Sequence, residues 1–387
     1  MRRVAKRISQ TSAKSFGMYD KASRLAGEDL IHLEVGRPHA DTPAHIKQAT
    51  IAALNAGKVH YSDPRGTLEL RETLAAKLTR QNGIKAGPQD VLVTNGVTHA
   101  AFVAFMAMFD PGDEVILLQP HYPQHVGKIE LAGAVPVFAT LDANDNYTIH
   151  AAAIEARVTS RTRAIVLVNP SNPTGRVYSR AELQALAEVA IRHDLIVIAD
   201  EVYEDIVYDG ARHISIAALD GMQDRTVTMF AFTKSYAMDG WRIGYLAAPQ
   251  WLMPALLKIA MNDVTHVNTF IQDGARAAVD GPVSVLEGLV ADDRSKRDFV
   301  VRSLNQMPGV RCALPQGTIY AFPDISETGI PSQELADRIL QEAHVVVEAG
   351  SFYGEAGEGH LRICFGSESS ERLEEGMKRL TAFFNGL

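Results

Sequence analysis

One stretch of the chain reads Leu195-Ile196-Val197-Ile198-Ala199-Asp200-Glu201-Val202-Tyr203. Its first five residues are apolar without polar alternation, which is typical of a strand covered on both faces. The run ends in the carboxylate of Asp200, and a buried carboxylate is costly unless it meets a cation. In an open α/β sheet, ligands bind at the carboxyl ends of the strands. The stretch therefore predicts a buried strand with an acidic group at the ligand-binding edge of a sheet.

Similar short apolar runs alternate with stretches of helical spacing through the middle of the chain. The apolar runs lie at residues 91–94, 114–118, 135–138, 164–168, 226–231 and 243–247, and the helical stretches at 68–81, 98–109, 151–158 and 181–193. Such alternation implies a mostly parallel sheet with right-handed crossovers. We predict an α/β fold whose large, ligand-binding domain, residues 46–283, has a mostly parallel sheet of about seven strands between helices.

From about residue 284 the pattern changes to long helical stretches around short strands. The helical stretches span 286–307, 332–342 and 370–384, and the short strands 310–313, 319–323, 345–348 and 360–364. This pattern predicts a smaller α+β domain over residues 284–387. The first 45 residues lack the alternation, and we expect them to form an N-terminal arm and part of the smaller domain. No long polar linker separates the domains, so ligands are expected at their interface.

Charge and cysteine content restrict the partners and the compartment. The 387 residues include 38 Lys and Arg against 46 Asp and Glu, a formal net charge of −8. This acidity argues against a nucleic-acid or membrane-surface partner, because both require basic patches. Two cysteines, Cys312 and Cys364, favour a reduced, cytoplasmic protein. No apolar run approaches about 18 residues, so neither a membrane span nor a signal peptide is predicted.

Two basic residues follow the apolar run 226–231. Lys234 has apolar and aromatic neighbours, which lower the pKa of its amine and make it a better nucleophile. Arg242 lies eight residues further on, where it can reach the same pocket and bind a phosphate through two parallel hydrogen bonds. The alternatives are a surface lysine at a strand end and an arginine in a structural ion pair.

Side chains that suit a flat, charged ligand follow other strands. Asp200 could pair with a protonated pyridine nitrogen, and Tyr203 could donate to a phenolate oxygen on the same ring. Asn172 lies in the turn 169–175, which two prolines and a glycine make tight. Tyr122 could stack on a flat cofactor. The alternatives are an aspartate that caps the next helix, a plain turn and a tyrosine packed in the core.

A glycine turn joins the run 91–94 to the helical stretch that follows it. The turn contains Gly96, Val97 and Thr98, and backbone N–H groups at a helix start bind phosphate with the help of the helix dipole. Glycine turns are common in α/β proteins, so this turn alone is weak evidence. The order of all the motifs along the chain is stronger evidence, because each motif lies at or just after the carboxyl end of a predicted strand.

This order resembles the class I and II aminotransferases, the fold type I pyridoxal 5′-phosphate (PLP) enzymes of the aspartate aminotransferase superfamily. The resemblance extends over residues 33–366. It implies that PLP is the cofactor and is carried by Lys234, and that Asp200 pairs with the ring nitrogen. It also implies that Tyr203 and Asn172 donate to the ring oxygen. Of these, Lys234, Asp200 and Tyr203 are the predicted catalytic residues.

The resemblance also assigns the phosphate and the ring face of the cofactor. Gly96, Val97, Thr98 and Arg242 match the phosphate-binding groups of the family, and Tyr122 matches the ring that stacks on the cofactor.

Three further positions concern the substrate and the neighbouring subunit. Tyr61 is similar to a tyrosine that reaches the phosphate of the partner subunit, which implies a homodimer with shared active sites. Arg362 resembles the clamp for the substrate α-carboxylate, and Gly36 a glycine whose backbone closes over it. The chain departs from the family at Ala231, where many members have a phosphate-binding serine. Thr233 or another donor is expected to substitute.

The resemblance implies transfer of the amino group of an L-amino acid to a 2-oxo acid by a ping-pong mechanism. The runner-up is a PLP-dependent C–S β-lyase, which uses nearly the same pocket. A non-enzymatic PLP-binding regulator is a remote alternative. Such regulators carry an added DNA-binding domain, whereas this sequence has only about 30 residues before the matching region and no basic recognition segment. A nicotinamide dehydrogenase is disfavoured, because no Gly-x-Gly-x-x-Gly motif follows the early strands. No metal site is predicted.

The sequence does not identify which amino acid is the amino donor. Arg37 and Arg65 are candidates to bind a second carboxylate, although each could form a structural ion pair. Residues 61–66 and 270–273 also resemble arginine–pyruvate transaminase, which would place Asp63 or Asp239 against a basic substrate.

Overall fold

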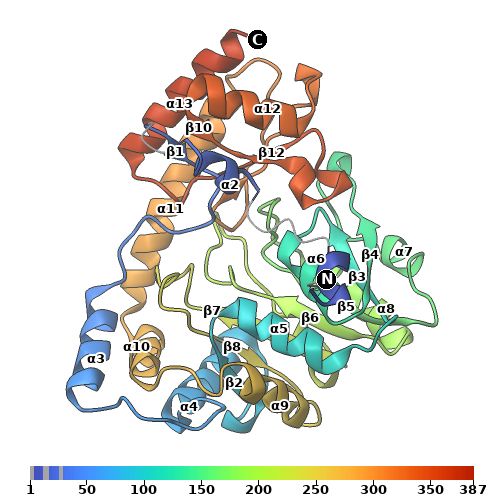
Figure 1. The fold of residues 1–387 in the computed structure, drawn as a ribbon, viewed down its shortest axis with the longest axis vertical. Coiled ribbons are helices and arrows are strands. Elements are labelled where there is room, and N and C mark those ends of the chain that lie inside the picture. Colours follow the sequence, from blue (N-terminus) through green and yellow to red (C-terminus); the bar gives the residue numbers. More distant parts are fainter. Residues whose placement is uncertain (1–3, 12–16, 26–28) are drawn as a thin grey trace.

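A seven-stranded sheet crosses the centre of the computed structural model, which describes residues 4–11, 17–25 and 29–387 (Figure 1). Its strands are β2 (Val91–Thr94), β3 (Glu114–Gln119), β4 (Val135–Thr140), β5 (Thr162–Val168), β6 (Ile196–Asp200), β7 (Thr226–Ala231) and β8 (Gly244–Ala247). They lie in the order β2-β8-β7-β6-β5-β3-β4. β8 is antiparallel to both neighbours and the other pairs are parallel. The predicted mostly parallel α/β sheet is confirmed.

The apolar run 195–199 forms the middle of this sheet. β6 lies between β5 and β7, and Val197, Ile198 and Ala199 are fully buried. Successive side chains of a strand point to opposite faces. Val197 and Ala199 accordingly belong to one hydrophobic cluster, and Ile198 belongs to another. The run lacks polar alternation because helices cover both faces of the sheet.

Helices α3 to α10 cover these two faces of the seven-stranded sheet. One face is covered by α5 (Val97–Met108), α6 (Pro123–Leu131) and α9 (Met253–Asp263). The other is covered by α3 (Ala44–Asn55), α4 (Leu68–Lys77), α7 (Ala151–Glu155), α8 (Arg180–Arg192) and α10 (Thr269–Asp280). The predicted stretches correspond to α4, α5, α7 and α8, and a π-helical turn (Leu78–Asn82) continues α4. The sequence analysis did not identify α3, α6, α9 or α10.

The C-terminal part packs long helices against short strands. Its helices are α11 (Val283–Leu304), α12 (Ser332–Arg338) and α13 (Ser370–Asn385). A three-stranded sheet has the order β11 (Glu348–Ala349), β12 (Leu361–Cys364), β9 (Tyr320–Ala321). The expected strand at 310–313 is reduced to an isolated bridge between Arg311 and Asp324. Pro308 and Pro315 bracket this run, and proline cannot donate to a strand ladder.

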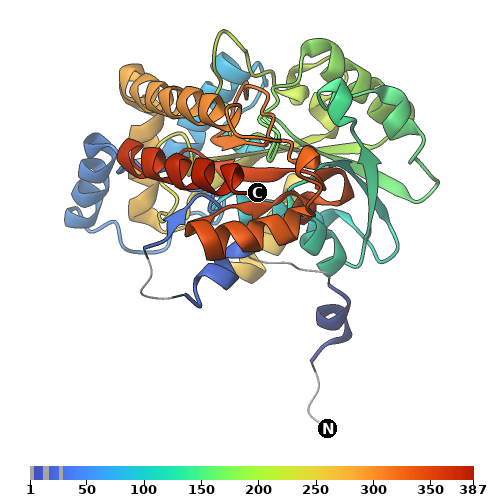
Figure 2. The same ribbon diagram turned by 90° about the horizontal axis from the view of Figure 1, so that it is seen from above.

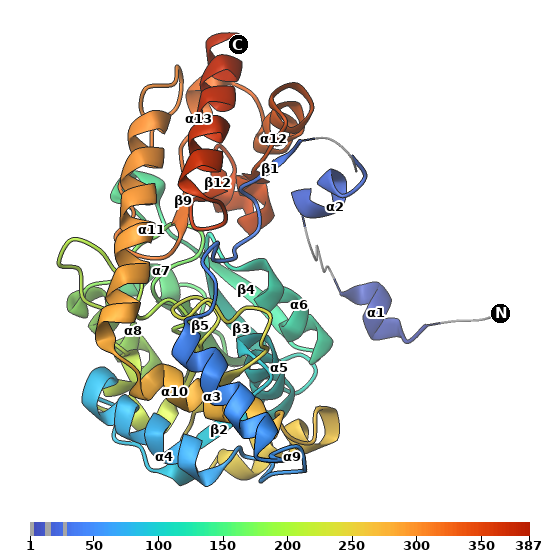
Figure 3. The same ribbon diagram turned by 90° about the vertical axis from the view of Figure 1, so that its left-hand side faces the viewer.

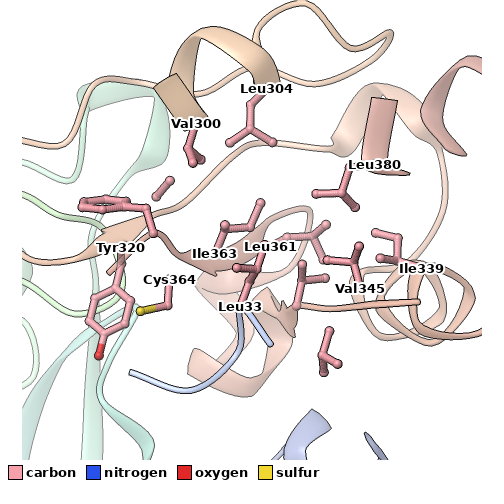
Figure 4. Packing of buried hydrophobic residues seen from close by; sticks show 14 of the residues in the cluster. Leu33, Val300, Leu304, Tyr320, Ile339, Val345, Leu361, Ile363, Cys364 and Leu380 are labelled. Carbon is pink, nitrogen blue, oxygen red and sulfur yellow. The ribbon is translucent and has the colours of Figure 1, made fainter. Parts of the chain in front are cut away.

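The N-terminal segment is tied to the C-terminal part by strand pairing and by apolar packing. β1 (Ile31–His32) pairs in parallel with β10 (Val345–Val346). Figure 4 shows the shared core, where Leu33 lies among Val345, Leu361 and Ile363. α2 (Met18–Ala22) also buries apolar side chains in this core. α1 (Lys6–Gln10) projects from the main body and is in contact with it at α6 (Figures 2 and 3).

The domain limits after residues 45 and 283 stay a prediction. Across the described residues, no helix combines the length and the apolar character needed to cross a bilayer.

Candidate active site

A cavity of about 890 Å³ is lined by residues at the carboxyl ends of the central strands and by residues of the C-terminal part of the chain. The predicted site residues that line it are Gly36, Val97, Thr98, Tyr122, Asn172, Asp200, Tyr203, Lys234, Arg242 and Arg362. They come from positions more than 300 residues apart, so the topology gathers what the chain separates.

Lys234 follows β7. No ion pair among the described residues joins its amine to a carboxylate. The amine donates a hydrogen bond to the carbonyl oxygen of Gly36. Burial lowers the pKa of Lys234 to about 8, and the guanidinium groups of Arg362 and Arg242 act in the same direction. A substantial fraction of the amine is therefore unprotonated near pH 8 and able to act as a nucleophile.

Asp200 is the last residue of β6 and is 3% exposed. Its Oδ2 lies 3.0 Å from Nε2 of His125, and the N–H of Val202 donates to its Oδ1 at 3.4 Å. Burial lowers the pKa of His125 despite the opposing effect of this carboxylate. The neutral ring is therefore the form that donates its Nε2–H to Asp200. The carboxylate is thus solvated by protein donors inside a buried site.

His125 was not identified from the sequence. It lies three residues after Tyr122, at which α6 is capped, so both side chains project from the same end of that helix. Their rings meet edge to face with centroids 5.2 Å apart. The sequence signal that could have found His125 is this i, i+3 spacing from a predicted site residue.

Tyr203 and Asn172 are both held by polar contacts at the cavity. The hydroxyl of Tyr203 lies 2.7 Å from that of Tyr320, and the two rings are buried. Burial raises the pKa of Tyr203 well above its usual value and that of Tyr320 to about 12, so both keep their protons. Asn172 accepts a hydrogen bond from Nη1 of Arg362 through Oδ1 at 3.3 Å. Its amide NH₂ group consequently remains its donor.

Arg362 on β12 is held on several sides. Besides Asn172, it donates through Nη2 to the carbonyl oxygen of Glu34. Its guanidinium carbon lies 4.3 Å from the ring centroid of Tyr320 and 5.0 Å from that of Tyr353. Figure 4 shows Tyr320 at the edge of the apolar core with its hydroxyl turned away from it. The aromatic faces and hydrogen bonds keep a buried cation in a defined place in the cavity wall.

The start of α5 and Arg242 form a pocket wall suited to an anion. Gly96, the residue before α5, has a φ of 79°, and a Cβ built there would lie 2.7 Å from Nη2 of Arg242. The positive φ favours glycine at this position, and the missing side chain leaves room for the guanidinium to approach. No side chain caps α5, so the N–H groups of Val97 and Thr98 have no intrahelical acceptor. A helix start of this kind next to an arginine binds phosphate well.

Two predicted positions do not line the cavity themselves. Gly96 lies behind it, in contact with Arg242. Tyr61 is 88% exposed and has its ring against His266, 5.0 Å away. Thr233, the expected substitute for the missing serine, is buried and lines the cavity.

Some of the residues predicted to bind the side chain of the amino-donor substrate line the cavity, and others lie outside it. Arg65 and Arg71 both pair with Asp63, at 3.0 and 3.3 Å, outside the cavity lining. Arg65 thus forms the structural ion pair that was its alternative. Arg37 and Asp239 line the cavity and are exposed.

Two further carboxyl groups in the lining were not identified from the sequence. Glu348 lies opposite Arg362 in the β11–β12 pair and accepts a hydrogen bond from the N–H of Met18 at 3.1 Å. Burial raises the pKa of Glu348 to about 7. Glu34 lies 2.9 Å from Nδ1 of His32. Glu348 is the first residue of β11, and Glu34 follows β1 by two residues. Both come after short apolar runs in the sequence, where no local pattern separates them from solvated residues.

Comparison with known proteins identifies the family. The chain matches the family described as Aminotransferase class I and II over residues 28–380. It is 39% identical to an aspartate aminotransferase of Pyrococcus abyssi over 366 residues, 94% of this chain and 93% of that protein. It is 37% identical to an arginine–pyruvate transaminase of Pseudomonas aeruginosa, covering 92% and 90%.

A solved structure gives the same result. The aromatic aminotransferase from Pyrococcus horikoshii superposes with a TM-score of 0.90 at 38% identity, covering 95% of this chain and 98% of that one. The predicted family is confirmed, and the relatives carry names of aminotransferases rather than of lyases. The chain therefore belongs to the class I and II aminotransferases and is an amino-acid aminotransferase.

Proposed function

We propose that this aminotransferase uses PLP, held in the cavity with Lys234 as the point of covalent attachment. The observation that carries the proposal is that a buried carboxylate and an amine of lowered pKa line one cavity beside an uncapped helix start and an arginine. This donor set fits the groups of PLP: Asp200 for a protonated ring nitrogen, Arg242 for the phosphate and Lys234 for the aldehyde. When bound, PLP supplies an electron sink for the carbanion formed when the substrate Cα loses its proton.

The remaining polar groups fit the other parts of this cofactor. The N–H groups of Val97 and Thr98 and the hydroxyl of Thr233 would bind the phosphate together with Arg242. The donors of Tyr203 and Asn172 would face the ring oxygen. The pKa of Tyr203 supports this role, because a hydroxyl that keeps its proton can donate to an anionic oxygen.

The substrate side of the reaction falls to two basic residues. Arg362 would bind the α-carboxylate through its planar guanidinium, close to the backbone of Gly36, and so orient Cα. The amine of Lys234 would take the proton from Cα and return it to the aldehyde carbon of the cofactor, C4′, as general base and then general acid. An L-amino acid would leave as its 2-oxo acid in the first half-reaction, and a second 2-oxo acid would be aminated in the reverse sequence.

We also propose a homodimer with shared active sites. Tyr61 is 88% exposed, and it lies in a segment with two other exposed apolar side chains, Val59 and Leu68. Apolar side chains grouped at a surface support a contact with another protein. Tyr61 would then reach the phosphate in the partner's cavity rather than in its own.

An amino-donor panel tests the function and separates it from the runner-up. Purified enzyme loaded with PLP would be assayed on acidic, basic, neutral and aromatic L-amino acids with pyruvate, 2-oxoglutarate or oxaloacetate as acceptor. We expect product only when an acceptor is present, with parallel-line kinetics of a ping-pong mechanism. Release of pyruvate from cysteine-type substrates without an acceptor would instead support a C–S β-lyase.

A further inference from the structure

The start of α5 lacks the usual helix cap. An N-cap side chain ordinarily accepts a hydrogen bond from the backbone N–H of one of the next three residues. Here the N-cap is Gly96, which has no such side chain, and its φ of 79° favours glycine over other residues. The turn therefore needs another group to hold its conformation while its first N–H groups stay available.

His99 supplies that group from the third position of the helix. Its Nδ1 accepts a hydrogen bond from the backbone N–H of Asn95 at 3.0 Å. A glutamate or glutamine at the third position of a capping box accepts from the N–H of the N-cap residue, whereas His99 reaches one residue further back, to Asn95. The N–H of Gly96 is taken by the carbonyl oxygen of Thr94 at 2.8 Å. Of the turn's N–H groups, those of Val97 and Thr98 are thus left for a ligand.

The hydrogen bond requires a neutral ring. Because Nδ1 accepts, the ring proton lies on Nε2, which is 3.5 Å from Oδ2 of Asp263 at the end of α9. Asp263 is the charged group that faces the ring within the described part of the chain. A protonated ring would carry hydrogen on both nitrogens and could no longer accept from Asn95. The ring is 8% exposed, and burial lowers the pKa of His99, which favours the neutral form.

We propose that His99 is a positioning residue that fixes the Asn95–Thr98 turn in the conformation that binds the cofactor phosphate. The inference rests on the proposed function, since it takes the phosphate of PLP as the ligand of this turn. His99 touches neither the phosphate nor the substrate, and it acts through the peptide of Asn95. Loss of its acceptor would leave a part-buried N–H without a protein partner beside the phosphate site.

Two substitutions separate positioning from simple packing. His99→Leu keeps much of the volume but removes the acceptor, whereas His99→Asn keeps an acceptor oxygen in place of Nδ1 and cannot be protonated. The dissociation constant of PLP from each apoenzyme would be measured by absorbance or fluorescence between pH 5.5 and 8.5. At pH 8 we expect affinity to fall about tenfold in H99L, the size of one lost hydrogen bond, and to stay near wild type in H99N.

The pH profile gives the second readout. Wild-type affinity should fall relative to that of H99N as the pH drops below the pKa of His99, because only the histidine loses its acceptor on protonation. Equal affinities of wild type and H99L at pH 8, or parallel pH profiles of wild type and H99N, would overturn the proposal. If H99L does not fold, the H99N profile decides alone. Failure of the wild type to bind PLP at all would refute the proposed function instead.

Discussion

Lys234 and Asp200, the two residues that define the site, differ in their polar partners. Lys234 loses solvation without gaining a carboxylate partner, so burial lowers the pKa of its amine to about 8. Asp200 is more deeply buried, at 3% exposed, and receives donors from His125 and from the N–H of Val202. The first arrangement favours a nucleophilic amine, and the second gives a buried carboxylate its hydrogen-bond donors. Each residue is therefore defined by its neighbours more than by its type.

The pKa of Lys234 predicts how the apoenzyme takes up PLP. Only the unprotonated amine can attack an aldehyde, so the rate of attachment should rise about tenfold per pH unit below pH 8 and level off above it. Stopped-flow absorbance would measure the rate, and borohydride reduction followed by mass spectrometry would locate the adduct. Lys234→Ala should abolish the adduct.

A second lysine provides a matched control for this experiment. Burial also lowers the pKa of Lys128 to about 8, but Lys128 lies outside the cavity lining and donates to the carbonyl oxygen of Gln124. Lys128→Ala should keep the reducible adduct. An adduct that survives in K234A but disappears in K128A would show that the wrong lysine had been assigned.

The contact between His125 and Asp200 predicts a further effect at the residue scale. His125→Ala should lower kcat about ten- to a hundredfold, the range for losing one hydrogen bond to a charged group. His125→Gln offers an amide donor to the same carboxylate and should restore part of the loss. Steady-state kinetics of the two variants would measure this. Equal kcat values for H125A and wild type would exclude a role for the contact.

At the scale of elements, strand ends and helix starts supply the groups of the site. β6 ends in Asp200, β7 precedes Lys234, and α5 begins with the turn that faces Arg242. The antiparallel pair β11–β12 adds the carboxyl group of Glu348 opposite Arg362. Regular elements hold these groups because their backbone hydrogen bonds leave little freedom at the ends.

The element pair β11–β12 has a consequence for stability. Burial raises the pKa of Glu348 from 4.5 to about 7. The unfolded chain ionises this group at lower pH than the folded one, so stability should fall as the pH rises from about 4.5 to about 7, by about 3 kcal/mol in total. Glu348→Gln removes the ionisation and keeps an acceptor for the N–H of Met18. The variant should be more stable than wild type at pH 8 and similar at pH 4.5.

Thermal or urea unfolding at several pH values would measure the difference. A wild-type curve parallel to that of E348Q across this range would show that Glu348 does not titrate as described.

On the scale of the whole molecule, the cavity is closed by parts of the chain that are distant in sequence. β1 joins β10, and Leu33 enters the core of the C-terminal part, which brings Gly36 and Glu34 to the cavity wall beside Arg362. Tyr61, in contrast, is exposed and does not line the cavity of its own chain. The proposed dimer would use it to complete the site of the partner.

Shared active sites predict complementation between two inactive variants. Lys234→Ala and Tyr61→Ala each impair every site of their own homodimer, but a mixed dimer contains one site with both residues intact. Refolding an equal mixture should restore about a quarter of wild-type activity, because half of the dimers are mixed. Activity assays of the mixture and of the separate variants would test this. No gain on mixing, with dimers seen by sedimentation, would exclude shared sites.

Some helices could not be predicted, because their sequence signals also fit other types of local structure. Pro123 and Pro254 lie in the first turn of α6 and of α9, where proline is compatible with a helix. The same residue is also a common signal of a turn, so composition could not separate the two readings. The central strands carried no such ambiguity, because an unbroken apolar run between polar segments suits a strand with two covered faces.

The sequence by itself determined the α/β fold and the succession of strand-end residues, because both depend on local periodicity and on the identity of single side chains. The contacts of His125 with Asp200 and of Tyr203 with Tyr320 join residues 75 and 117 positions apart. No local pattern encodes such a pairing, and only the packing of separate elements brings the partners within hydrogen-bond distance. The sequence neighbours of Lys234 indicated the direction of its pKa shift, but the raised pKa of Glu348 was decided by the tertiary structure, since it follows from desolvation in a cavity that exists only once the chain has folded.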